Sequence, residues 1–270
     1  MKITLPISHL INKDNIKEFD SLGTEAYQFR RNDFTEKINS IDIRGKEIIF
    51  HDSVALLCHD FMDEFFTLNP SHFITSYFSQ YSTNLAPACL FYDRKYVTPC
   101  IWKYDAKSEI LSREEIKDIV RKKLVALKHF FNDLSIENSN RYALPAYTHI
   151  CNPMFLTEVV NELNIGFCFD IAHAIVSYKT WYYMDYNTLE EFIFAHPLDK
   201  CTEVHISSPG DFIDNELMLD RHEVPTDFEW DILKDVLLNV KQPYIAIEYY
   251  GDMLILQDCY YKLSKILGRT

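Results

Sequence analysis

Several short, apolar, β-branched segments of this 270-residue chain end in an acidic or imidazole side chain. IGFCFD ends at Asp170, TEVHIS carries His205 near its end, and YIAIEYY carries Glu248. In a parallel barrel, the side chains that bind ligands lie at the carboxyl ends of the strands. The pattern therefore constrains both the fold and the place of the site, since it predicts a parallel barrel whose polar residues converge on one face.

Strand-like and helix-like segments alternate along the chain without a Gly/Ser-rich or Pro-rich linker. Ser112 and Glu115 have capping-box spacing, and the apolar residues of the following IKDIVRKKLVALKHFF recur at three and four, as in an amphipathic helix. Such alternation indicates parallel strands joined by right-handed crossovers, and eight repeats favour a closed sheet. We therefore predict the α/β class, with one (β/α)8 TIM-barrel domain over residues 1–270. The eight strands are expected in KITLPIS (2–8), EAYQF (25–29), EIIFHDS (47–53), PACLFYD (87–93), YALPAYT (142–148), IGFCFD (165–170), TEVHIS (202–207) and YIAIEYY (244–250).

Three regions are less regular than the rest. Residues 59–85 have mostly helical periodicity, and residues 92–104 have the character of an insertion on the ligand-binding face. The aromatic segment WYYMDY (181–186) is interpreted as a loop or the start of a helix, with core packing or substrate stacking as its role and packing as the default.

The chain is acidic and its cysteines form no recognisable pairs. A count of 40 Asp and Glu against 27 Lys and Arg gives a net charge of −13, which disfavours partners such as duplex DNA that are bound through their phosphates. Seven cysteines without a CxxC motif predict free thiols in a reducing compartment. No segment has the length of a membrane span, and the N-terminal apolar stretch is too short for a signal peptide. We expect a cytoplasmic protein that binds neither nucleic acid nor membrane.

Residues of the types that bind metals are concentrated in the C-terminal part of the chain. Asp170 ends a strand apolar enough to be buried on both faces, where a carboxylate is costly unless it is paired or bound to a metal. Asp220 and His222 are two apart, so in an extended segment both side chains face one ion. Each residue alone also has a structural explanation, as a helix cap or a core histidine, but together they favour a metal site. The expected ligands are Asp170, His173, His205, Asp220, His222 and Glu248, with His51 of EIIFHD as a weaker candidate.

The sequence motifs typical of nucleotide binding, zinc proteases and serine hydrolases are absent. The chain has no GxxxxGK[ST] or GxGxxG for a glycine-cradled nucleotide, no HExxH and no GxSxG. Cys58 and His59 are adjacent, and neighbours on a helix do not face each other, so a Cys/His nucleophile pair is disfavoured.

These motifs resemble those of the xylose-isomerase-like barrels, a superfamily that includes endonuclease IV. DIAH resembles its strand-end Asp-x-x-His, VHIS its His strand, DRHE its Asp-Arg-His motif and AIEYY its closing Glu. A closer similarity, over about residues 160–252, is to the bacterial family of multinuclear iron oxidases that includes enzymes of methanobactin biosynthesis and related peptide-modifying oxidases. DYNTLEEFIFAHPLDKCTEVHISSPG and DRHEVPTDFEW carry this similarity, together with IIFHDS, although that family usually has Asn at the position of His173.

The resemblance implies two sets of ligands and several losses. One set is Asp170, His205 and Glu248, and the other is His173, Asp220 and His222. The family's fourth strand brings a His where PACLFYD offers Tyr92 and Asp93, its fifth brings a bridging Glu where YALPAYT offers Pro145, Ala146 and Tyr147, and its second often brings an acid where this chain has Gln28. His149 is the nearest substitute for the missing Glu and the weakest of the candidate ligands. We therefore expect one or two bound ions rather than a third at His51, with iron as the metal and zinc or manganese as alternatives.

The resemblance further implies an iron-dependent oxidoreductase that activates dioxygen and oxidises a peptide, often at a cysteine of a ribosomally made precursor, with a small partner protein presenting it. An acidic enzyme favours a basic leader peptide or partner. Two other hypotheses remain open. One is a divalent-metal hydrolase or sugar isomerase/epimerase, and the other is a barrel that has lost part of its metal site and its catalysis. The identity of the metal separates the first two, and retention of a tightly bound metal separates both from the third.

Overall fold

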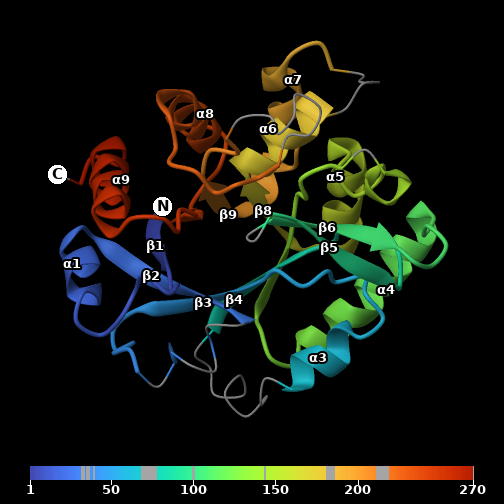
Figure 1. Cartoon of the computed structure of the whole chain (residues 1–270), viewed down its shortest axis with the longest axis horizontal. Helices are drawn as coiled ribbons and strands as arrows, with labels where there is room; N and C mark the ends of the chain where they lie inside the picture. The colour runs from blue at the N-terminus through green and yellow to red at the C-terminus, as the bar shows by residue number, and fades with distance from the viewer. Residues whose placement is uncertain are drawn as a thin grey trace.

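Eight parallel strands form a closed barrel, which confirms the predicted (β/α)8 fold (Figure 1). The computed structural model describes residues 1–31, 34, 37–38, 40–67, 78–98, 101–142, 144–180, 186–210 and 219–269, with the backbone alone for 94–98 and 101–105. The strands follow one another around the barrel in the order β1-β10-β9-β8-β7-β4-β3-β2, and β2 pairs with β1 to close it. Their bounds are β1 Lys2–Pro6, β2 Thr24–Arg30, β3 Glu47–Asp52, β4 Phe78–Asn84, β7 Asp133–Glu137, β8 Gly166–Asp170, β9 Cys201–Ile206 and β10 Tyr244–Ile247.

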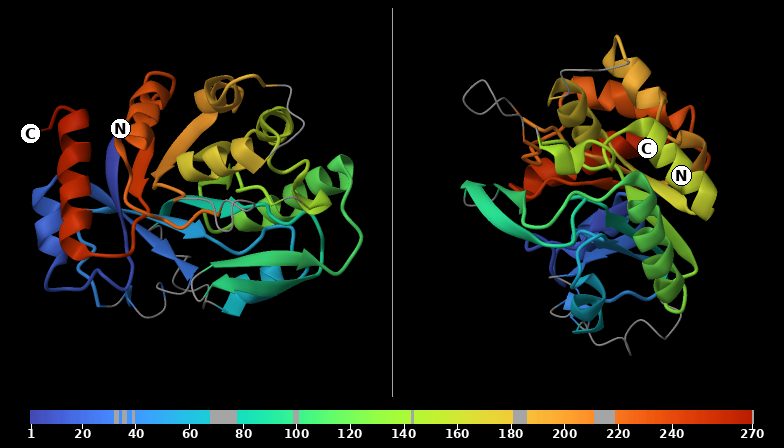
Figure 2. Two further views of the ribbon diagram at one scale, coloured as in Figure 1. Left: turned by 45° about the horizontal axis from the view of Figure 1, so that its top comes forward. Right: turned by 90° about the vertical axis from the view of Figure 1, so that its right-hand side faces the viewer.

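Helices pack around the outside of the sheet (Figures 1 and 2). The capping box of Ser112 and Glu115 forms as predicted and begins α4, which buries Val120 and Leu124 in the hydrophobic core. Within the described residues, none of the helices is long and apolar enough to cross a membrane. The helices are α1 Ile16–Ser21, α3 Phe61–Thr67, α4 Arg113–Leu127, α5 Pro153–Leu163, α6 Ile171–Thr180, α7 Leu189–Phe194, α8 Asp227–Leu237 and α9 Met253–Ile266, with short 3-10 turns at η2 Pro145–Tyr147 and η3 Leu198–Lys200.

The fourth and fifth barrel strands are β4 and β7, so the predictions of strands in PACLFYD and YALPAYT are wrong. PACLFYD leads into a hairpin outside the barrel, with its last two residues in β5, and YALPAYT contains the η2 turn. Residues 59–85 hold α3 and all of β4, so the expectation of a mostly helical segment is wrong for residues 78–84; residues 68–77 lie outside the described part of the chain. Both true strands, FSQYSTN and DLSIE, are rich in polar side chains and lack the apolar run that marked the others.

The irregular segment at 92–104 is an insertion, as predicted. It forms an antiparallel hairpin of β5, Tyr92–Thr98, and β6, Ile101–Ala106, which makes a separate two-stranded sheet (Figure 2). The hairpin connects the carboxyl end of β4 to the start of α4, and therefore belongs to the ligand-binding side of the barrel. The aromatic segment 181–185 lies outside the described residues.

The register of the strands brings the polar residues to the same end of the barrel. Asp170 of β8 is paired with His205 of β9, and His51 of β3 is paired with Ser82 of β4. These pairs stand at the carboxyl ends of their strands, where a parallel barrel builds its sites.

Candidate metal centre

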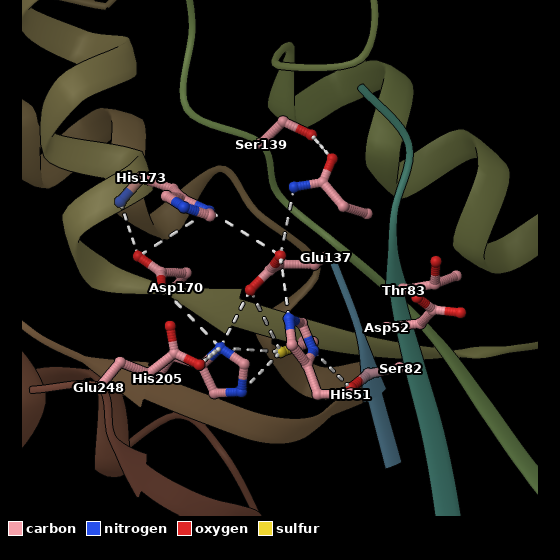
Figure 3. A network of polar contacts seen from close by, with 12 residues as sticks. His51, Asp52, Ser82, Thr83, Glu137, Ser139, Asp170, His173, His205 and Glu248 are labelled. Carbon is pink, nitrogen blue, oxygen red and sulfur yellow. Dashed lines mark hydrogen bonds and ion pairs between the residues drawn. The ribbon is translucent and has the colours of Figure 1, made fainter. Parts of the chain in front are cut away.

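A cluster of acidic and imidazole side chains fills the carboxyl end of the barrel (Figure 3). We call it the carboxylate–imidazole cluster. Seven of the predicted ligands belong to it, and one further residue, Glu137, joins them. Its members are His51 from β3, Glu137 from β7, Asp170 from β8, His173 from α6, His205 from β9, Asp220 and His222 from the loop between β9 and α8, and Glu248 directly after β10.

Glu137 is the acidic residue that the sequence reading missed. Its Oε1 lies 3.0 Å from His205 Nδ1, and its Oε2 lies 3.8 Å from His51 Nε2 and 3.9 Å from His173 Nδ1. Burial alone would raise the pKa of this carboxyl, but the three imidazoles outweigh it and lower the pKa to about 2. The acid that the fifth strand was expected to lack is therefore present, because the fifth strand is DLSIE and ends at Glu137.

His149, the proposed substitute for that acid, lies elsewhere. It follows the η2 turn, and its ring packs against Phe155 with the two ring centroids 5.9 Å apart. Among the described residues, His149 belongs to none of the groups of ligand atoms that are close enough to share an ion. With Glu137 in place, no substitute is needed.

His205 lies at the centre of the cluster and is fully buried. Its Nδ1 faces three carboxylates, at 3.0 Å from Glu137 Oε1, 3.4 Å from Glu248 Oε1 and 3.8 Å from Asp170 Oδ2. Its Nε2 points the other way, to Glu203 Oε1 at 3.0 Å. Burial disfavours the imidazolium, but Cys168 and the surrounding carboxylates raise the pKa of His205 well above its ordinary value.

The two carboxylate oxygens of Asp170 have different surroundings. Oδ1 accepts a hydrogen bond of 2.6 Å from the backbone N–H of His173 and so caps the first turn of α6. Oδ2 is buried and accepts no hydrogen bond from a described residue. Burial raises the pKa of Asp170 to about 7, and the neighbouring carboxylates add to this effect. One oxygen is thus structural, and the other lies in the cluster 3.8 Å from His205 Nδ1, without a hydrogen-bond partner among the described residues.

His173 lies in the first turn of α6 rather than in a loop, which corrects the sequence-based expectation. Its Nδ1 donates to the carbonyl oxygen of Asn138 at 2.8 Å, and its Nε2 lies 3.3 Å from Asp220 Oδ2. A histidine that donates one ring N–H to a carbonyl presents the lone pair of its other nitrogen, the usual arrangement of a metal ligand.

Asp220 and His222 do converge, but not through an extended segment. His222 adopts a left-handed backbone with φ of 50°, and its N–H donates to Asp220 Oδ1 at 3.1 Å. The resulting tight turn folds the His222 ring back, so that Nδ1 lies 3.0 Å from Asp220 Oδ2. With 29% of its side chain exposed, His222 lies at the solvent-facing edge of the cluster.

Glu248 closes the cluster and pairs with a residue from the opposite end of the chain. Arg30, at the end of β2, makes a hydrogen-bonded ion pair with Glu248 and stacks over Tyr250, with its guanidinium 4.8 Å from the ring centroid. Against the effect of burial, Arg30 and the neighbouring histidines hold the pKa of Glu248 well below its ordinary value.

A second polar layer lies directly beneath the cluster, inside the barrel. Glu203 is fully buried and accepts hydrogen bonds from Gln28 Nε2 at 2.7 Å and Gln80 Nε2 at 2.9 Å. Its third partner is His205 Nε2. Gln28, at the position where relatives were expected to carry an acid, therefore supports this buried carboxylate.

The cluster fits bound divalent cations. Metal binding requires neutral histidines, and four buried carboxylates then face one described permanent cation, Arg30. Uncompensated buried charge is very costly. Bound cations would balance the remaining negative charge, and Asp170 Oδ2, which accepts no hydrogen bond from a described residue, is free to bind one of them. Oxygen and nitrogen donors in this mixture suit iron, zinc or manganese. Within the described part of the chain, three groups have ligand atoms that all lie within 4.8 Å of one another: His51, Glu137, Cys168 and His205; Glu137, Asp170 and His173; and Asp170, His205 and Glu248.

Solved structures share the fold at low sequence identity. The 3-keto-D-glucoside 4-epimerase from E. coli matches with a TM-score of 0.58 and 13% identity over 99% of both chains. A D-psicose 3-epimerase matches with a TM-score of 0.60 and 12% identity, and endonuclease IV from Thermus thermophilus matches with a TM-score of 0.55 and 11% identity. Each match covers 100% of both chains. These similarities show the TIM-barrel fold.

The particular family follows from the sequence. The family model described as "RiPP precursor modification enzyme MbnB/TglH/ChrH" matches residues 110–267, more than half of the chain. The protein belongs to this family, whose members modify ribosomally made precursor peptides. No curated protein sequence matches the chain.

Proposed function

We propose that this protein is an iron-dependent, dioxygen-activating oxidoreductase that modifies a peptide, with a cysteine of a ribosomally made precursor as its target. The observation that carries the proposal is the buried carboxylate–imidazole cluster in a member of a peptide-modifying family. When bound, iron supplies redox chemistry with dioxygen that these side chains do not provide by themselves.

The chain's own residues have distinct tasks in this proposal. The ligands are Asp170, His173, His205, Asp220, His222 and Glu248, joined by Glu137 and His51. Asp170 and Glu137 each belong to two of the three groups of ligand atoms, which suits carboxylates that bridge neighbouring ions. Two or three ions are therefore proposed, where the sequence favoured one or two.

Access to the cluster is proposed from the side of its member His222 and the adjacent Arg30, whose side chains are 29% and 22% exposed, while most of the cluster is buried. A peptide thiol arriving there reaches the ligands before it reaches the barrel core. With a net charge of −13, the protein favours a basic leader segment or a basic partner protein that presents the peptide. The described cysteines are all free, and a reducing cytoplasm is the compartment that we propose.

A second candidate function is carbohydrate epimerisation or metal-assisted hydrolysis. Epimerases and endonuclease IV share the whole barrel with this chain, at identities that speak for the fold alone. This function uses the same ligand types with manganese, zinc or magnesium, so the metal and the substrate decide between the two.

Elemental analysis of protein purified with and without air, combined with an absorption spectrum and peptide assays, tests the proposal. We expect two to three irons per chain and a mass change in a cysteine-containing precursor peptide that requires dioxygen. The variant Glu248→Gln should lose metal and activity while keeping its circular dichroism spectrum. Glu223→Gln, at the exposed rim beside Arg221, is the matched control and should retain both. Manganese or zinc with epimerase activity on ketohexoses, or a protein that retains no metal after reconstitution, would refute the oxidase.

A further inference from the structure

We propose that Cys168 is a metal ligand, and that Cys168, His51 and Glu137 form a sulfur-containing subsite distinct from the oxygen- and nitrogen-donating positions around Asp170. The inference deepens the proposed function, because it needs the cluster to bind metals, but it does not depend on the reaction or the substrate. It also restores a role to His51, for which the sequence left little support.

Cys168 is placed by the strand that carries Asp170. The two residues are separated by one position in β8, so their side chains point to the same side of the sheet, into the barrel. Cys168 is fully buried, and β8 is paired with β7 so that Cys168 lies opposite Glu137. Its Sγ lies 4.0 Å from Glu137 Oε1 and 3.6 Å from His205 Nε2.

His51 is oriented as a ligand from the other side. Its Nδ1 lies 3.0 Å from Ser82 Oγ, and its Nε2 lies 3.8 Å from Glu137 Oε2. If Nδ1–H donates to the hydroxyl, the lone pair of Nε2 is directed toward Glu137. Such a hydrogen bond on the far nitrogen is how proteins fix the orientation and tautomer of ligating histidines.

The three residues lie near the spacing of ligands around one ion, because one ligand atom from each lies within 4.8 Å of the others. With metal–nitrogen and metal–oxygen bonds of about 2.1 Å and metal–sulfur bonds of about 2.3 Å, neighbouring tetrahedral ligand atoms lie roughly 3.4–3.6 Å apart. The His51 Nε2 lies 3.8 Å from Glu137 Oε2, and the Cys168 Sγ lies 4.0 Å from Oε1 of the same carboxylate. Small rotations of the side chains close this difference, and three protein ligands leave a fourth position open, as in catalytic sites.

The simpler role for Cys168 is that of a small apolar side chain in the core. The surroundings argue against it. Besides Glu137 and His205, the neighbouring interior positions hold Gln28, Gln80 and Glu203, which form a polar layer. Thiolate is a softer donor than carboxylate and selects zinc and iron over magnesium and manganese. The subsite would therefore give this cluster a preference for zinc or iron that oxygen and nitrogen ligands alone do not provide.

Titration of the metal-free protein with Co²⁺ under anaerobic conditions tests the assignment. A cobalt–thiolate bond absorbs in the near ultraviolet by ligand-to-metal charge transfer, whereas carboxylates and imidazoles do not give this band. We expect the band in the wild-type protein, saturating with one equivalent of Co²⁺. Cys168→Ser should lose the band and bind that equivalent at least about 10-fold more weakly. Cys151→Ser, which changes a buried cysteine in another part of the fold, is the matched control and should keep the band.

The outcomes separate this inference from the proposed function. If Co²⁺ binds stoichiometrically to the wild-type protein without the band, Cys168 is not a ligand, while the metal centre stands. If Cys151→Ser loses the band and Cys168→Ser keeps it, the ligand is not Cys168. If Co²⁺ does not bind at all, the metal centre and this inference both fall. Since the wild-type spectrum alone can refute the inference, a folding failure of Cys168→Ser would not protect it.

Discussion

The β8–β10 side of the barrel and the β4–β7 side contribute to one site from sequences of opposite character. On the β8–β10 side, apolar runs end abruptly at Asp170 and Glu248. On the other side, β4 and β7 direct polar residues inward at more than one level, as Gln80 and Ser82 do in β4. A parallel strand is recognised by a continuous apolar run. The comparison shows that this signal fails in β4 and β7, which lack such a run.

The largest expected effect is the loss of bound metal when a carboxylate from one side of the barrel or the other is changed to an amide. Glu137, from the β4–β7 side, belongs to two groups of ligand atoms, and Glu248 belongs to one. Changes to residues that merely support a ligand already cost about 10–100-fold in metal affinity, so Glu137→Gln is expected to cost at least about 100-fold at two positions. Metal content per chain, measured by mass spectrometry, should fall by about twice as much as in Glu248→Gln.

Equal metal losses in the two variants would break the comparison, because they would show that Glu137 does not bridge. Asp52→Asn provides a control for effects of charge near the site. Asp52 lies one residue after His51, but its carboxylate accepts hydrogen bonds from Arg31 and Tyr81. The Asp52→Asn variant should therefore have the metal content of the wild-type protein.

The same contrast explains how much the sequence could predict. The barrel, the capping box at Ser112 and the convergence of Asp170, His205 and Glu248 follow from apolar periodicity and strand-end residues. Glu137 was missed because DLSIE has only two apolar residues, although their alternation and the terminal acid were a usable signal. His173 and His222 were placed among the ligands by their motifs, but their local geometry was not predictable. It depends on where α6 begins and on a left-handed residue, which are set by tertiary contacts.

The next effect concerns the polar layer that joins the two sides. Glu203→Ala removes the common acceptor of Gln28, Gln80 and His205 and leaves their donors buried. We expect the free energy of unfolding of the metal-free protein to fall by about 3–5 kcal/mol, measured by urea denaturation. Glu203→Gln keeps the shape and one acceptor, and should cost less than half as much. An alanine variant within about 0.5 kcal/mol of wild type, as for a surface change, would mean that this layer is not structural.

A change of Arg30 tests whether its guanidinium and the bound metal balance the same negative charge, that of Glu248. In the metal-free protein, Arg30→Met leaves the carboxylate of Glu248 buried without its guanidinium, at a cost of about 3 kcal/mol. Bound metal should replace much of that charge. The rise in melting temperature on adding metal is therefore expected to be larger in Arg30→Met than in wild type. Equal rises would show that Arg30 and the metal do not share Glu248.

The smallest effect contrasts the two faces of β8. Outside the barrel, His196 packs against Phe167 and Phe169, and burial lowers its pKa to about 4. Because the folded pKa lies below the unfolded value of about 6.5, the stability from neutral His196 is complete above pH 6.5 and is lost as the pH falls toward 4. At pH 5 the loss amounts to about 2 kcal/mol relative to pH 7. In urea denaturation, the difference in stability between wild type and His196→Gln should shrink by that amount.

Inside the barrel, Asp170 should show the opposite slope in the metal-free protein. Burial raises the pKa of its carboxyl to about 7, above the unfolded value. Its contribution is therefore complete at low pH and is lost as the pH rises toward 7. Comparing Asp170→Asn and His196→Gln with wild type across this range isolates the two contributions, because neither residue contacts the other's partners. If both differences change with the same sign, the carboxylate–imidazole cluster already compensates the charge of Asp170 without a metal, and the argument that its oxygen requires a cation is lost.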